Sequence, residues 1–182
     1  MAFFLMLPDG ETGTNEWTRS GAGSYASHVQ SDDDDTSFVY ETRNGHEITF
    51  TMANPSVAEE NIDFNEDVTV RPSVTAHYEG GSGTVAMSIR VTGTGILQGS
   101  AIASVAVDSS YPTYNGNQTT SKVIGTDWDY AGLENAQVKL ECVGFPSRST
   151  YLRVSYVYIR VDYTVATTEV ATDNATFFGA NF

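Results

Sequence analysis

Residues 151–164 read YLRVSYVYIRVDYT, and this stretch decides the fold class. It is rich in β-branched and aromatic residues, which are enriched in β-strands. Arg153, Ser155 and Asp162 interrupt any apolar stripe that a helix would need. The stretch therefore predicts a long strand, the clearest one in the chain.

Further strand patterns precede it. Residues 84–92 alternate apolar with small or polar side chains, which is the period of a half-buried strand. Residues 96–107 and 134–143 also predict strands. After Trp128, residues 129–133 predict one short helical turn. No longer window has the apolar recurrence of an amphipathic helix.

Glycine-rich turns separate several of these strands. Residues 43–45 (Arg-Asn-Gly) lie between predicted strands over 36–42 and 46–52, and an Asn-Gly pair supplies the positive φ angles of a tight hairpin. Residues 79–83 (Glu-Gly-Gly-Ser-Gly) lie between predicted strands over 68–78 and 84–92 in the same way. We therefore expect a β-hairpin at each of these two turns.

The chain has 182 residues, of which 40% are hydrophobic, so it suits one domain with a real core. About seven to nine short strands with Gly-rich turns predict an all-β protein, an antiparallel β-sandwich or jelly roll with extended N- and C-terminal arms. The expected organisation is an apolar arm over residues 1–7, a single jelly-roll-like domain over 8–165 and a second arm over 166–182.

Charge and cysteine content exclude several classes. Nine basic residues against 23 acidic ones give a net charge of -14, which argues against nucleic acid as a partner. The single cysteine, Cys142, cannot form an internal disulfide. We also expect no membrane partner and no export signal, because residues 1–7 are too short for a signal sequence. Synthesis in a host cytoplasm is therefore expected.

Motifs that carry catalysis are missing. The chain has no Gly-Lys-Ser/Thr phosphate loop and no Gly-x-Ser-x-Gly elbow. His28, His46 and His77 have no ligand spacing. We therefore expect no enzyme, no cofactor and no catalytic residue. The acidic run over residues 32–35 (four Asp) could gather around a cation, but an extended loop points its carboxylates apart, so a solvated loop is favoured and no metal is expected.

Aromatic residues in loop-like segments are one candidate site. Trp17, Tyr111, Tyr114 and Trp128 could form a platform for ligand binding, since exposed aromatic rings bind sugar rings in many β-sandwich modules. Packing in the core or between subunits is the alternative, and it is the favoured one.

The termini are the other candidate site, because both carry large apolar residues. Each end could add a strand to its own sandwich, or it could dock on a neighbouring subunit by strand addition. In the second case the expected contact residues are Phe3, Phe4, Leu5, Phe177, Phe178 and Phe182.

Several short patterns resemble a family of β-rich structural proteins of tailed bacteriophages. They are Pro8-Asp9-Gly10, Trp17-Thr18, Ser20-Gly21, the acidic loop running into Phe38-Val39, Trp128 followed by Ala136-Gln137-Val138, and residues 150–163. The resemblance spans roughly residues 8–163. One difference is that Lys139-Leu140-Glu141-Cys142 stands where members often carry a glycine. The resemblance implies a jelly-roll-like domain on a virion surface and no catalytic residues.

The expected function is therefore that of a non-enzymatic structural protein of a tailed-phage virion. It would decorate or cement the capsid as a homo-oligomer, with a trimer favoured, bound to the major capsid protein on the particle surface. The alternative is a carbohydrate- or receptor-binding adhesin module of a tail or head fibre. A third interpretation, a subunit of an extracellular filament, is disfavoured because no export signal is expected.

Overall fold

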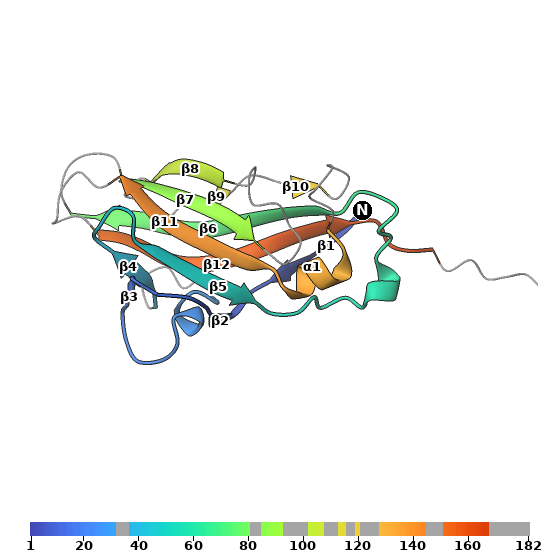
Figure 1. The fold of residues 1–182 in the computed structure, drawn as a ribbon, viewed down its shortest axis with the longest axis horizontal. Coiled ribbons are helices and arrows are strands. Elements are labelled where there is room, and N and C mark those ends of the chain that lie inside the picture. The colour runs from blue at the N-terminus through green and yellow to red at the C-terminus, as the bar shows by residue number, and fades with distance from the viewer. Residues whose placement is uncertain are drawn as a thin grey trace, which may run out of the picture.

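The computed structural model describes residues 1–31, 37–80, 85–92, 102–107, 113–115, 119–120, 128–144 and 151–167. Within them, two antiparallel β-sheets pack face to face around a shared core (Figure 1). The expected all-β, jelly-roll-like sandwich is therefore confirmed.

Sheet A has seven strands among the described residues. They are β1 (Ala2–Met6), β3 (Thr18–Arg19), β4 (Val39–Glu41), β6 (Thr69–Glu79), β9 (Thr113–Asn115), β10 (Thr119–Thr120) and β12 (Tyr151–Tyr163). The predicted strand over 151–164 is the centre of this sheet. β12 pairs along one side with β6, and along the other with β4 at its start and β1 at its end.

Sheet B has five described strands in the order β2-β5-β11-β7-β8. They are β2 (Pro8–Glu11), β5 (Glu47–Met52), β7 (Val85–Thr92), β8 (Ile102–Val107) and β11 (Gln137–Gly144). Two 3-10 helices, η1 (Ala26–His28) and η2 (Glu59–Asn61), lie in connections. The helical turn predicted after Trp128 is confirmed as α1 (Tyr130–Glu134), whose Gly132 amide donates to Asp129 at 2.6 Å.

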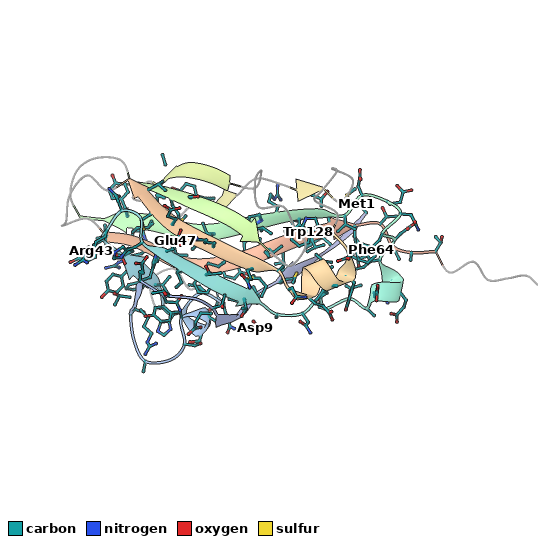
Figure 2. All side chains as sticks on the ribbon, viewed as in Figure 1. Met1, Asp9, Arg43, Glu47, Phe64 and Trp128 are labelled. Atoms are coloured by element: carbon teal, nitrogen blue, oxygen red, sulfur yellow. The ribbon has the colours of Figure 1, made fainter. Side chains whose placement is uncertain are left out.

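The core fills the space between the sheets. Sheet A contributes a row of fully buried aliphatic side chains from β12, including Val157, Ile159 and Val161, and sheet B contributes Ile48 and Phe50 from β5. Both tryptophans are also buried; Figure 2 labels Trp128, which directly precedes α1. The sandwich is therefore held together mainly by buried apolar surface.

The two expected hairpins are wrong. β4 belongs to sheet A and β5 to sheet B, and β6 and β7 are divided in the same way. The Asn-Gly turn itself forms, since Gly45 has a φ of 77° and its amide donates to the Cys142 carbonyl at 2.7 Å. A turn residue fixes a local reversal of the chain, but long-range packing decides which strands pair.

The N-terminal segment adds a strand to its own sandwich, so the expected separate arm over residues 1–7 is wrong. β1 pairs with β12 from Ala2 opposite Tyr163 to Met6 opposite Ile159. At the other end, the described chain continues past β12 through a bridge between Ile62 and Val165. Residues 168–182, most of the expected C-terminal arm, lie outside the described residues.

Candidate functional site

A β-bulge in β12 gives sheet A its unusual outer surface. Apolar side chains at Leu152 and Val154 point into the core, and the register with β6 then shifts between Val154 and Tyr156. At this point β12 has one more residue than β6, which is a β-bulge. Before the bulge the even-numbered residues of β12 face the core. After it, from Val157 on, the odd-numbered residues do.

The opposite set of β12 side chains shares one surface. Tyr151, Arg153, Tyr156, Tyr158 and Arg160 are half-buried or exposed, in contrast to the fully buried residues between them. Neighbouring side chains on one face of a strand are about 7 Å apart. We call this outer surface of sheet A, with the side chains that flank it from β1, β3, β4 and β6, the aromatic face.

One depression of about 320 Å³ lies where β3, β4 and the start of β12 meet, and we call it the β4 depression. It is lined by Arg19, Ser20, Phe38, Tyr40, Tyr151 and Arg153. The Tyr40 and Tyr151 rings meet edge to face with centroids 6.0 Å apart. In this arrangement the two rings do not stack face to face on each other. The guanidinium of Arg153 lies 4.5 Å from the Phe38 centroid.

A second depression of about 250 Å³ lies toward the other end of β12, and we call it the β1 depression. Figure 1 places β4 and β1 at opposite ends of the sandwich. The depression is lined by Phe3, Leu5, Arg71, Thr113, Tyr156, Tyr158 and Arg160. The Tyr156 and Tyr158 rings lie 5.1 Å apart and are tilted by 39°. The Arg160 guanidinium covers the Phe3 ring at 4.0 Å.

Carboxylates hold two of the arginines on the aromatic face in place. Arg153 forms an ion pair with Glu79. Arg160 donates from Nε and Nη2 to Asp162, at 3.0 and 2.7 Å. These hydrogen bonds lower the pKa of Asp162 below its usual range, so the carboxylate stays ionised at neutral pH. Both guanidinium groups are therefore oriented before any ligand arrives.

For the two tryptophans of the possible aromatic platform, packing, the favoured interpretation, is confirmed. Trp17 and Trp128 are each 2% exposed, and Trp17 donates its indole N–H to the His46 carbonyl at 3.1 Å. Tyr114 packs against the core from β9. Trp17 and Trp128 therefore form no surface platform, because large rings fill the interior of the sandwich, whereas Tyr114 is half-buried. Tyr111 lies outside the described residues.

The expected contact residues of the N-terminal arm divide between two faces of β1. Phe4 is 6% exposed and packs on Tyr163 with ring centroids 5.7 Å apart, so its assignment as an intersubunit contact is wrong. Phe3 and Leu5 face outward at 56% and 40% exposure and line the β1 depression. Phe177, Phe178 and Phe182 lie outside the described residues.

The described thiol and an imidazole–carboxylate pair have structural roles. Burial raises the pKa of the Cys142 thiol far above its usual range, with Glu41 and Glu141 acting in the same direction, so the thiol stays protonated. The His46 Nδ1 atom lies 3.0 Å from the Glu41 carboxylate, whose other oxygen accepts the Thr42 and Arg43 amides. These contacts hold the turn that connects β4 to β5.

Neither a metal site nor a membrane span emerges from the residues that the structure describes. They contain no group of three or more His, Cys, Asp or Glu side chains able to hold a metal ion. The acidic run over residues 32–35 lies outside them. No helix in the described ranges is long and apolar enough to cross a membrane.

Comparison with solved structures finds similar folds in carbohydrate-binding modules. The CBM22-1 xylan-binding domain of Paenibacillus barcinonensis Xyn10C is 11% identical, with 87% of this chain and 89% of that domain covered and a TM-score of 0.45. The family 11 module of Clostridium thermocellum, in complex with a mixed-linked tetrasaccharide, is 11% identical, with 89% and 96% covered and a TM-score of 0.40. The CBM32 of AlyQ, in complex with 4,5-unsaturated mannuronic acid, is 16% identical, with 82% and 96% covered and a TM-score of 0.41.

No family model and no curated protein matches the chain. Identities of 11–16% and TM-scores below 0.5 leave the ligand to be argued from this chain's own residues. The tyrosines and arginines of the aromatic face were not predicted as ligand residues, because the predicted platform was confined to aromatic residues in loop-like segments. One signal in the sequence could have indicated them. The aliphatic residues of β12 stand at even-numbered positions up to Val154 and at odd-numbered positions from Val157 on, as a bulge between them would require.

Proposed function

We propose that this protein is a carbohydrate-binding module that holds an oligosaccharide along the aromatic face without a chemical step. One observation carries the proposal. Four tyrosines, Tyr40, Tyr151, Tyr156 and Tyr158, lie on the same outer surface and line its two depressions, with arginines beside them. Folding needs no aromatic rings there, because the core is filled from the opposite side of the sheet.

The chemistry of the lining suits a sugar. A pyranose ring has apolar C–H faces that pack on an aromatic ring, and hydroxyl groups around its rim that need hydrogen-bond partners. Tyr156 and Tyr158 supply rings, while Arg160 and the exposed Thr113 supply donors in the same depression. Aromatic walls with a few fixed polar groups are the usual composition of a ligand site.

The shape of the face favours a chain over a single small molecule. Arg153 belongs to the β4 depression and Arg160 to the β1 depression. The strand between them spans roughly 20 Å at the usual rise per residue. A linear oligosaccharide could contact both depressions at once and gain affinity from each.

The test is binding to a panel of soluble polysaccharides: xylan, mixed-linkage β-glucan, polymannuronate and polygalacturonate. We expect at least one to bind in affinity electrophoresis and calorimetry, with its chain length unchanged after incubation. Tyr158→Ala should weaken that binding about tenfold or more, as the loss of a stacking ring does. Thr49→Ala, on the outer side of sheet B, is the matched control and should leave binding unchanged. Failure of the whole panel would reject the proposal.

A second candidate, attachment to another protein as a virion decoration, has one observation in its favour. Phe3 and Leu5 expose apolar surface on the same face, and exposed apolar patches often mark protein interfaces. Light scattering after size exclusion separates the two. A stable trimer that binds no polysaccharide would favour the decoration function, whereas a monomer that binds a polysaccharide through Tyr158 would exclude it as the main role of this face.

A further inference from the structure

We infer that the β1 depression is a subsite for an acidic sugar unit, one that carries a carboxylate or a sulfate ester. The inference rests on the proposed function and adds a charge preference to it. It comes from an imbalance of charge on the aromatic face, which has the opposite sign to the net charge of -14 of the whole chain.

The imbalance arises from the strand register. Arg71 of β6 lies directly opposite Arg160 of β12, so two guanidinium groups share one cross-strand pair. Like charges directly opposite each other destabilise a sheet. Asp162 is the carboxylate beside them among the described residues, and it accepts its side-chain hydrogen bonds from Arg160. One positive charge therefore remains at this end of the aromatic face.

Arg71 carries the uncompensated charge. It lines the β1 depression, and its Nε atom is buried without a hydrogen-bond partner in the described part of the chain. A buried donor left unpaired is unfavourable. A bound carboxylate or sulfate would accept from the Arg71 guanidinium, whose fork of N–H donors can pair with two acceptor oxygens at once. Tyr156 and Tyr158 line the same depression and provide rings for the sugar itself.

The β4 depression has the same charge count among the described residues, two arginines against one carboxylate, but neither of its arginines has a buried donor without a hydrogen-bond partner. Its Arg153 is paired with Glu79. Its other cation, Arg19, is exposed, donates to the Gly21 carbonyl at 3.1 Å and lies over the Tyr25 ring. The acidic sugar unit should therefore bind in the β1 depression, while the β4 depression binds a neutral unit of the same oligosaccharide.

Long-range repulsion between an acidic protein and an acidic polymer sets the conditions of measurement. At 0.1 M salt, charges more than about 10 Å apart are largely screened, whereas contacts at hydrogen-bond distance are less affected. Binding should therefore be measured at or above this ionic strength, where the local arginines outweigh the net charge.

The test compares two forms of one polymer by calorimetry on the full chain. The probes are oligogalacturonate and its methyl ester, which differ only in the charge of the carboxyl group. We expect the acid form to bind about tenfold more tightly, as one charge-assisted contact allows. Sulfated and unsulfated dextran distinguish a sulfate subsite from a carboxylate subsite. A single-stranded oligothymidylate tests whether the face binds nucleic acid instead.

Variants then locate the preference. Arg71→Gln should reduce the ratio between acid and ester affinities to about one, with the ester affinity changed less than about twofold. Arg71→Lys keeps the charge and should retain part of the ratio, which covers the case that glutamine disturbs the fold. Lys139→Gln on β11 of sheet B changes the net charge by the same amount on the opposite face and should leave the ratio unchanged.

Each outcome decides one of the two proposals. Equal affinities for acid and ester together with equal affinities for sulfated and unsulfated dextran, or a preference that survives Arg71→Gln, would overturn the acidic subsite and leave carbohydrate binding standing. If neither the acid form nor the ester, neither dextran and none of the panel polysaccharides binds, both the acidic subsite and carbohydrate binding are overturned. Tighter binding of oligothymidylate than of any sugar would assign the face to nucleic acid.

Discussion

The outer faces of the two sheets differ although the same geometry builds both. On sheet B, the outward residues of β5 and β11 are Glu47, Thr49, Thr51, Gln137, Lys139, Glu141 and Val143. All but Val143 are polar or charged, and Lys139 forms an ion pair with Glu47 across the two strands. On sheet A, the outward residues of β12 are three tyrosines, two arginines and Asp162, and the tyrosines and arginines line two depressions.

The difference separates what folding requires from what it leaves free. Each sheet needs alternate apolar residues on the side that faces the core, and both have them. The outward positions have no such requirement, and a solvated surface like that of sheet B satisfies the fold. Exposed tyrosines therefore call for an explanation outside stability, and ligand binding provides one.

The largest effect on the free energy of unfolding should come from a substitution in the core. Trp17→Ala should lower the free energy of unfolding by about 3–5 kcal/mol, because it removes a buried ring. Tyr151→Ala on the aromatic face should change it by less than about 1 kcal/mol, since Tyr151 is 41% exposed. Denaturant unfolding with a linear extrapolation measures both.

A large loss of stability in Tyr151→Ala would break the comparison, because the aromatic face would then be a structural layer. A small loss in Trp17→Ala would return that residue to the list of surface candidates. The pair thus tests directly the assignment of tryptophans to the core and of tyrosines to the binding face.

The sequence predicted strands well and their partners poorly. β12, β7 and α1 appear where composition and alternation placed them. The pairing failed because Gly45 and Gly80 mark reversals that join different sheets. The energy that assigns a strand to a sheet comes from contacts between distant segments, and a local pattern does not contain it.

The candidate site was predicted in kind but not in place. For Trp17 and Trp128 the sequence left a ligand platform and packing open, with packing favoured, and both residues lie in the core. The tyrosines of β12 were counted as strand formers, since the same residue types favour strands and ligand surfaces. Only the bulge between Val154 and Tyr156 brings them to one face, and its register becomes known once the partner strand β6 is placed.

An intermediate effect should come from the bulge residue. Ser155 is fully buried, and its hydroxyl has no hydrogen-bond partner in the described residues. Ser155→Ala removes the unpaired group at little loss of volume, so it should raise the free energy of unfolding by up to about 1 kcal/mol. Ser88→Ala, at a buried position of β7 in sheet B, is a matched comparison. Thermal and denaturant unfolding measure the two changes. A destabilised Ser155→Ala variant would mean that the hydroxyl has a partner that holds the bulge.

The smallest effect should come from the ion pair on the aromatic face. Because Arg160 lowers the pKa of Asp162 below its ordinary 3.8, the folded state binds a proton there less readily than the unfolded chain. The stabilisation is therefore present above that pH and is lost as the pH falls through the lowered value. Asp162→Asn should remove this dependence, and Arg160→Met should remove most of it without changing Asp162. Unfolding curves collected in steps below pH about 5 reveal the difference. A stability difference between the wild type and Asp162→Asn that persists undiminished at the lowest pH would show that Asp162 stabilises the fold through packing and not through its ion pair with Arg160.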